Sequence, residues 1–263
     1  KYNDTYELNQ GNELVSYKAP VKPLFADGKY YIFNKGAQKY MAAGAAWGTH
    51  AALTAEGLDY TIAFADGKYT LDSQVSNGGP NNFLNGSADD GPWNDGPAFG
   101  WTIEEISEGV YSINNGTKFI AAGENNTVTF ANDATAETAQ WTLISAADRD
   151  AANLASLQAA TAENGVDATF FIKGANFNRN DLRNSAWTHT RSGGNETFAG
   201  PGNKNRTTYG CEYWNNTFEV SQTITNLPEG IYEFSIAGYG TNGTTKIYAN
   251  DTEAAFVNTT SAA

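Results

Sequence analysis

Short apolar stretches separated by Gly, Asn and Asp recur along residues 25–145, and their pattern predicts β-strands. Three of these stretches begin with glycine and read GKYYI, GKYTL and GVYSI, at residues 28–32, 67–71 and 109–113. Each is matched further along by an aromatic residue followed by threonine and an aliphatic residue, at Tyr60, Trp101 and Trp141. A pattern that recurs with a period of about forty residues indicates an internal repeat.

Each repeat also contains an aromatic–aliphatic pair between its opening glycine and its closing aromatic residue. These pairs are Tyr40-Met41, Phe83-Leu84 and Phe119-Ile120. About four short strands per repeat give about twelve strands, and a single repeat cannot bury its own apolar face. Three repeats around a threefold axis can close a barrel without exposed edges. The predicted fold is therefore all-β, with a β-trefoil over residues 25–145 and the three closing aromatic residues in its core.

Two segments flank this predicted barrel. Residues 1–24 form a lead-in with strand-like stretches at 6–8 and 14–17, followed by two prolines. After the barrel, Ser145 and Asp148 form a capping pattern, alanine-rich sequence follows, and Gly165 is a stop signal. We expect a helical linker over residues 146–166, with one helix over residues 148–164 that acts as a packed spacer.

Strand patterns return over residues 167–263. They lie at 168–173, 218–224, 231–237 and 246–249, with a Pro-Glu-Gly turn at 228–230 between two of them. This pattern is typical of antiparallel sheets packed as a β-sandwich. Trp214 is expected in its core, since aromatic residues in strands are usually buried, and Phe218 is a core residue under the alternative in which the aromatic residues of this module bind no sugar.

Composition narrows the possible functions. The 263 residues carry a formal net charge of −13 and are 40% hydrophobic, which excludes a disordered chain. Nucleic-acid binding is not expected because Lys and Arg are not clustered, and no apolar run is long enough to span a membrane. The single cysteine, Cys211, and the two histidines, His50 and His189, lie too far apart in the sequence to predict a catalytic triad, a metal site or a cofactor. We therefore expect a non-enzymatic protein.

The first module resembles the ricin-type β-trefoils, the R-type lectin family. The resemblance covers residues 25–145 and rests on the three matching openers and closers. In that family each repeat usually ends in Gln-x-Trp, and sugar pockets combine an acid, an aromatic residue and an amide. Here Leu58, Phe99 and Ala139 stand in place of the glutamine, and Tyr60 replaces one tryptophan.

The second module resembles galactose-binding-like, carbohydrate-binding jelly-roll domains of large secreted proteins from gut Bacteroidetes. Its most specific stretch is FEVSQTITNLPEGIYEFSIAGYG at residues 218–240. Such domains usually continue with further strands, so the resemblance implies a partial sandwich and further domains outside this chain. Asn, Gly and Thr are abundant and Lys is modest, a composition common in exported bacterial surface proteins, so we expect a protein that is secreted or held on the outer cell surface. The first residue, Lys1, is not Met, which indicates a processed or trimmed chain and does not bear on the compartment.

The predicted ligand site is the inserted loop ADDGPWNDGPAFG at residues 88–100, which combines an aromatic ring with carboxylates and an amide. Its candidate sugar-binding residues are Trp93, Asp90, Asn94 and Asp95, with Trp47 and His50 at the corresponding place in the first repeat. Trp187 and Tyr209 are the candidates in the second module, and Tyr213, Trp214 and Arg191 lie in the same region. The alternative interpretation is that the Asp and Asn residues make turns and Trp93 covers the barrel.

Other chemistry in this loop is less favoured by its spacing. The acidic residues do not match the order of an EF-hand calcium loop, and a flexible loop does not hold two carboxyl groups at the separation that glycoside hydrolysis requires. The leading hypothesis is non-catalytic glycan or polysaccharide binding, by a protein that acts alone or as the accessory part of a larger glycan-processing protein. The competing hypothesis is a structural spacer or a protein-docking scaffold.

Overall fold

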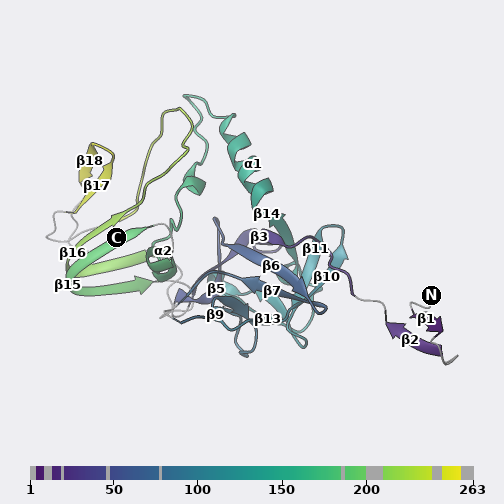
Figure 1. The fold of residues 1–263 in the computed structure, drawn as a ribbon. Coiled ribbons are helices and arrows are strands. Elements are labelled where there is room, and N and C mark those ends of the chain that lie inside the picture. Colours follow the sequence, from purple (N-terminus) through teal and green to yellow (C-terminus); the bar gives the residue numbers. More distant parts are fainter. Residues whose placement is uncertain are drawn as a thin grey trace. The chain divides into compact units, whose positions relative to one another are not determined.

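The structure, a computed structural model, describes residues 4–8, 14–18, 21–45, 48–76, 79–184, 187–199, 210–238 and 245–255 (Figure 1). The chain divides into two compact units, Lys1–Ile224 and Thr225–Ala263. No helix in the described ranges is long and apolar enough to cross a membrane.

The first unit is mostly β. Its strands before the first long helix are β1 (Asp4–Leu8), β2 (Leu14–Lys18), β3 (Gly28–Asn34), β4 (Lys39–Ala45), β5 (His50–Thr54), β6 (Asp59–Ala65), β7 (Lys68–Asp72), β8 (Phe83–Asn85), β9 (Trp93–Gly96), β10 (Thr102–Ser107), β11 (Val110–Asn114), β12 (Phe119–Ala122), β13 (Val128–Ala131) and β14 (Trp141–Ser145). Single 3₁₀ turns lie at Glu124–Asn126 and Glu137–Ala139. The remaining elements are α1 (Ala146–Leu157), a 3₁₀ turn at Thr169–Phe171, α2 (Arg179–Asn184), β15 (Thr188–Ala199) and β16 (Gly210–Ser221).

Six of these strands close into a barrel. Going around the ring, β3 pairs with β6, β6 with β7, β10 with β11, β11 with β14, and β14 with β3 again. The remaining junction, between β7 and β10, is a bridge from Tyr69 to Trp101, the residue just before β10. The predicted barrel-like sheet is confirmed, and it belongs to one twelve-stranded sheet.

The predicted repeat is visible in the register of this barrel. The tyrosine two positions after each opening glycine pairs with a closing aromatic residue, as Tyr30 with Tyr60, Tyr69 with Trp101 and Tyr111 with Trp141. Each repeat adds one hairpin outside the ring, made by β4–β5, β8–β9 and β12–β13. Sequence positions that match in the repeat therefore make matching pairings.

The apolar face of every repeat contributes to one shared core. Its fully buried side chains include Ile32, Met41, Leu53, Tyr60, Ile62, Leu71, Leu84, Trp101, Ile113, Ile120 and Trp141. Trp101 donates its indole N–H to the carbonyl of Leu84 at 2.9 Å, and Trp141 donates to the carbonyl of Ile120 at 2.9 Å. These two tryptophans make equivalent contacts in consecutive repeats.

Helix α1 begins where the capping pattern predicts, because the Ser145 hydroxyl accepts a hydrogen bond from the backbone N–H of Asp148. It ends at Leu157, earlier than predicted. Thr161 and Asn164 bond to each other instead, through backbone and hydroxyl contacts of 2.9 and 3.0 Å, and such local bonds compete with the helix. Arg149 holds the first turns to the barrel by stacking between the Tyr31 and Tyr40 rings, 3.9 and 4.0 Å from their centroids.

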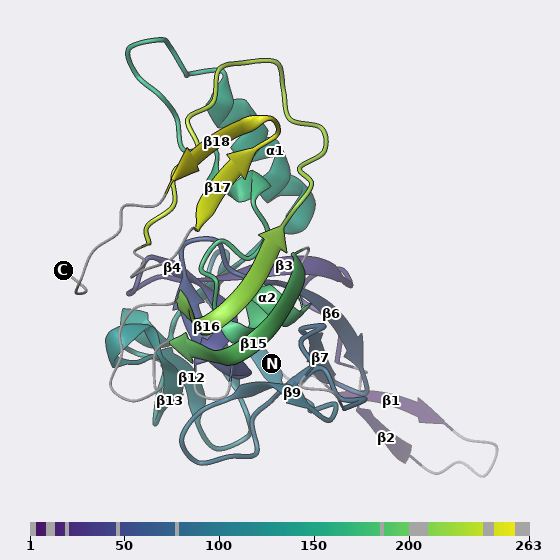
Figure 2. The same cartoon turned by 90° about the vertical axis from the view of Figure 1, so that its left-hand side faces the viewer.

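The segment after α1 differs from the predicted sandwich. The predicted strand at residues 168–173 is replaced by the 3₁₀ turn, because the Asp167 carboxylate accepts the backbone N–H of Thr169 and forms a side-chain turn. Strands β15 and β16 form a two-stranded hairpin of their own, which Figure 2 shows as a curved ribbon. Trp214 is 57% exposed and Phe218 is 36% exposed, so the prediction that they are core residues is wrong.

The second unit contains β17 (Lys246–Ala249) and β18 (Thr252–Ala255), which pair as a hairpin and confirm the predicted strand at 246–249. The predicted strand at 231–237 is not formed; its alternating apolar residues Ile231, Tyr232 and Phe234 are exposed. Within the described ranges, the chain after residue 167 forms hairpins and no packed sandwich.

Candidate functional site

The inserted loop of the second repeat contains strand β9, which joins two hairpins of the sheet. Trp93 at its start is paired with Asn85 of β8 and with His50 of β5. Directly opposed residues of neighbouring strands project from the same face of a sheet. Trp93 and His50, predicted from separate repeats, therefore lie side by side, and both are partly exposed.

Asn94 has a different role from the predicted one. Its side chain is fully buried, its amide oxygen accepts the Tyr60 hydroxyl at 2.8 Å, and its amide nitrogen donates to the carbonyls of Thr49 and Ala42 at 3.2 and 3.4 Å. The Ser73 hydroxyl donates to its backbone carbonyl at 2.6 Å. These contacts occupy the side-chain amide of Asn94 in the interior, so the prediction that Asn94 contacts a ligand is corrected. Asn94 instead anchors the loop to the core of the barrel.

Further contacts tie the loop to both neighbouring repeats. The backbone N–H of Ala51 donates to the carbonyl of Pro92 at 3.0 Å, and the Thr129 hydroxyl donates to the carbonyl of Asp90 at 3.3 Å. Gly91, with φ of 153°, passes so close to β13 that a side chain there would lie 2.5 Å from the Val128 carbonyl oxygen. The loop is thus held at several points.

The two predicted acidic residues remain accessible. Asp90 is exposed and Asp95 is partly exposed, and in β9 the partly exposed Trp93 and Asp95 alternate with the buried Asn94 and Gly96. Gly96 provides room for the indole, because a side chain at this position would lie 3.0 Å from Trp93 Nε1. Within the described ranges, no group of three or more His, Cys, Asp or Glu residues is arranged to hold a metal ion.

The remaining predicted sugar-binding residues are Trp47, Tyr209 and Trp187. Trp47 and Tyr209 lie outside the described residues. The Trp187 indole donates to the carbonyl of Gly174 at 2.9 Å, and its ring packs against Phe177 with centroids 5.0 Å apart. Trp187 is therefore engaged in packing within its own segment.

A second group of polar and aromatic side chains lies on the β15–β16 hairpin, where both strands bend at the same place. Gly193 has φ of 94°, and Asn215, near it on β16, has φ of 50°. Gly194 lies so close to β16 that a side chain would be 1.7 Å from the carbonyl oxygen of Trp214. Only glycine fits this approach without a backbone shift.

This bend changes which residues share a face. His189 and Glu196 are separated by an odd number of positions, so in a regular strand they would project to opposite faces. Here His189 Nε2 lies 3.0 Å from Glu196 Oε1. Tyr213 and Phe218 on the other strand are also an odd number apart, yet their rings stack with centroids 4.0 Å apart and 9° between planes.

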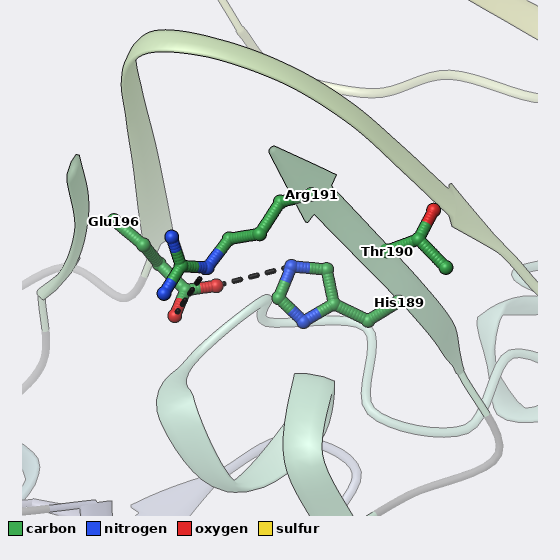
Figure 3. A pocket seen from close by; sticks show the side chains of 4 residues that line it. All are labelled: His189, Thr190, Arg191 and Glu196. Atoms are coloured by element: carbon green, nitrogen blue, oxygen red, sulfur yellow. Dashed lines mark ion pairs between the residues drawn. The ribbon is translucent and has the colours of Figure 1, made fainter. Parts of the chain in front are cut away.

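The Glu196 carboxylate is the centre of this group. Its side chain is 2% exposed and is shared between His189 and the Arg191 guanidinium, whose Nε lies 3.7 Å from Oε2. Figure 3 shows His189 and Arg191 converging on Glu196 while Thr190 points away. The Tyr213 hydroxyl lies 2.9 Å from the same His189 Nε2. Whether Nε2 donates to the Tyr213 hydroxyl or accepts from it depends on the tautomer of His189.

Burial of the Tyr213 ring, with Cys211 and Glu196 beside it, raises the pKa of its hydroxyl. The hydroxyl therefore stays protonated and neutral at physiological pH. Of this group, Tyr213 and Arg191 were predicted near a ligand from the sequence, whereas His189, Glu196 and Phe218 were not. The glycine pair at residues 193–194 is the signal of a bend, but it does not reveal which side chains the bend brings together.

Comparisons with known proteins identify similar folds but no family. No protein-family model matches the sequence, and no curated protein matches it. Among solved structures, a ricin B-like lectin from Macrolepiota procera in complex with lactose is 15% identical, covering 47% of this chain and 99% of its own, with a TM-score of 0.39. SeviL bound to an asialo-GM1 saccharide is 17% identical over 46% of this chain and 99% of its own, with a TM-score of 0.36.

An enzyme is also among the similar structures. A GlcNAcα1-4Gal-releasing endo-β-galactosidase from Clostridium perfringens is 18% identical over 46% of this chain and 33% of its own, with a TM-score of 0.37. Similarity at this level does not assign a function, so the case for a ligand rests on the geometry of the sites.

Proposed function

We propose that this chain is a non-catalytic glycan-binding protein, secreted or displayed on the outer cell surface, and that residues 25–145 are a β-trefoil of the ricin type. The proposed site is the outer face of β9 with its preceding loop. The observation that carries this proposal is the pair of Trp93 and His50, two partly exposed rings held side by side by backbone pairing.

The chemistry of this face suits a sugar. A pyranose ring has an apolar C–H face that packs on an aromatic side chain, and its hydroxyl groups need both donors and acceptors. Trp93 supplies the apolar surface, His50 supplies a ring nitrogen, and Asp90 and Asp95 supply acceptors from the same loop. Because the loop is anchored through Asn94 and Gly91, little conformational freedom is lost when a ligand binds.

The competing proposal is a structural spacer or docking scaffold. The inward orientation of Asn94 favours it, because one of the four residues predicted to bind sugar in the loop serves the interior. Under this proposal Trp93 covers the β8–β9 hairpin and binds no ligand. The two proposals differ in whether the exposed part of the indole responds to sugar.

The test is a titration of the full chain with neutral mono- and disaccharides, up to tens of millimolar, followed by tryptophan fluorescence. A shallow site of this kind binds with a Kd of about 1 mM, equivalent to about −4 kcal/mol. We expect a saturable change that Trp93→Ala abolishes and Trp93→Phe partly restores. Trp214→Phe is the matched control, since Trp214 is exposed but lies on another hairpin.

If no sugar in this range changes the fluorescence of the wild-type chain, the scaffold proposal is favoured. A saturable signal that survives in Trp93→Ala would place the binding site elsewhere in the molecule. That result would leave glycan binding intact but remove it from the barrel loop.

A further inference from the structure

The bent β15–β16 hairpin gathers five side chains that a regular hairpin would distribute over both faces. They are His189, Arg191, Glu196, Tyr213 and Phe218. The backbone conformations that cause this are unfavourable for side chains other than glycine, at φ of 94° for Gly193 and with a 1.7 Å approach at Gly194. Glycine adopts such conformations at little cost, which makes it the usual residue where a backbone bends or approaches another strand closely.

We propose that this face of the hairpin is a second saccharide-binding site, which takes a neutral sugar ring with two adjacent hydroxyl groups. Phe218 is the platform for the apolar face of the ring, and Arg191 donates hydrogen bonds to the hydroxyl oxygens. Glu196 is a positioning residue that holds Arg191 and His189. This site is independent of the barrel loop and makes the chain bivalent for glycans.

The degree of exposure of each residue supports this division of roles. Arg191 has 39% of its side chain exposed and Phe218 is 36% exposed, whereas the Glu196 side chain is 2% exposed. A ligand can therefore reach the guanidinium and the ring, but not the carboxylate directly. The guanidinium contacts the carboxylate through Nε at 3.7 Å, and its planar fork can present the terminal nitrogens to two adjacent oxygens.

The aromatic pair gives this site a fixed surface. Tyr213 and Phe218 stack nearly parallel, 9° apart, so Tyr213 supports one face of the Phe218 ring. The Tyr213 hydroxyl is held at His189 Nε2, which is in turn held by Glu196. Each ring is thus fixed before a ligand binds, and a fixed platform costs less conformational entropy on binding.

The charges favour a neutral ligand. The positive charge of Arg191 is balanced locally by Glu196, and the chain as a whole carries −13. An anionic ligand would meet no excess positive charge here and an unfavourable field from the rest of the protein. Sugar hydroxyls, which accept and donate hydrogen bonds without a net charge, suit this balance better.

The test uses the full chain and saturation-transfer NMR with galactose, glucose, mannose and lactose, each titrated to tens of millimolar. The titration is run on the Trp93→Ala background, so that the barrel loop does not contribute. We expect saturable binding that Phe218→Ala and Arg191→Met each weaken at least tenfold. Thr190→Ala is the matched control, because Thr190 lies on the same strand and points away from the group.

Glu196→Gln separates positioning from direct contact. It keeps the shape but weakens the hold on Arg191, so we expect weaker binding together with a changed His189 imidazole resonance in the absence of sugar. Unchanged sugar affinity in Glu196→Gln would show that Glu196 does not position the binding residues. Circular dichroism of each variant checks that the hairpin has not unfolded.

Two outcomes would overturn the inference. One is that Trp93→Ala removes all sugar binding, which would leave the proposed barrel site as the place of binding. The other is that only glucuronate or acetate binds, and that added salt weakens it, which would make this an anion site. Saturable binding that survives Trp93→Ala but not Phe218→Ala supports this inference even if the barrel proposal fails.

Discussion

At the scale of one residue, Asn94 shows how a polar side chain that is fully buried can anchor a loop through hydrogen bonds. The Tyr60 hydroxyl is buried with it, and burial raises the pKa of that hydroxyl. The sequence shows that Tyr60 replaces a tryptophan and that Asn94 lies in an insertion, but not that the two residues bond. A contact across 34 positions depends on the register of three strands, which composition does not reveal.

We expect Asn94→Ala to lower the free energy of unfolding by about 2–3 kcal/mol, because it leaves the buried Tyr60 hydroxyl without its acceptor and removes the side-chain donor to the carbonyls of Ala42 and Thr49. Urea denaturation followed by circular dichroism measures this change. Asn81→Ala, at an exposed position in the same repeat, is the control and should have little effect. Equal effects of the two substitutions would contradict the anchoring role.

At the scale of elements, the first turn of α2 carries a buried acid. The Asp181 carboxylate accepts the backbone N–H of Asn176 at 3.1 Å and of Asn178 at 3.4 Å. Burial nevertheless raises its pKa to about 7, and the nearby Glu56 adds to the rise. Asn176 also donates its side-chain amide to Glu56 at 2.9 Å, so the acid lies within a polar cluster.

This raised pKa predicts how stability depends on pH. In the unfolded chain the Asp181 carboxyl has a pKa near 3.8. Between pH 4 and 7 the folded chain therefore binds more protons than the unfolded one, and stability falls as pH rises through this window. We expect Asp181→Asn to flatten that dependence, by about 3 kcal/mol across the window at most. Denaturation midpoints at pH 4, 5.5 and 7 measure it, and parallel curves for both proteins would refute it.

The sequence predicted helices and strands well where they depend on neighbouring residues, and poorly where they depend on pairing with a strand that is distant in the sequence. Ser145 and Asp148 marked the start of α1, because capping depends on neighbours in the sequence. The alternation at residues 231–237 predicted a strand, but a strand also requires a second strand to pair with, and none pairs with it in the described ranges. The faces of β15 and β16 could not be predicted because a positive φ inverts the alternation.

At the scale of the whole molecule, the barrel follows from repetition. The same opening and closing motifs occur three times, so a strand that is poorly marked in one repeat can be predicted from the matching positions of the other two. The chain after residue 167 has no such repetition, and its predicted sandwich rested on single stretches. Residues whose environment is repeated, such as Trp101 and Trp141, were therefore the most predictable core residues.

This repetition makes a quantitative prediction. Trp101→Phe and Trp141→Phe each remove one buried indole and its hydrogen bond to a carbonyl at 2.9 Å. We expect each to cost about 2–3 kcal/mol, with nearly equal values. Thermal denaturation measures both, with the exposed Trp214→Phe as a control near zero. Costs that differ by more than about 2 kcal/mol would show that the repeats are not equivalent.

The Tyr60–Asn94 hydrogen bond ties the inserted loop to the core of the barrel. In the second and third repeats the indole N–H of the closing tryptophan donates to a backbone carbonyl of the same repeat. A tryptophan has no hydroxyl group that could donate a hydrogen bond to an inserted loop. Only the first repeat ends in tyrosine, and only the following loop carries the asparagine that meets it. Grafting that loop onto another repeat would require a tyrosine in the core as well. Whether a repeat can anchor such a loop thus depends on its closing core residue rather than on the exposed residues of the loop.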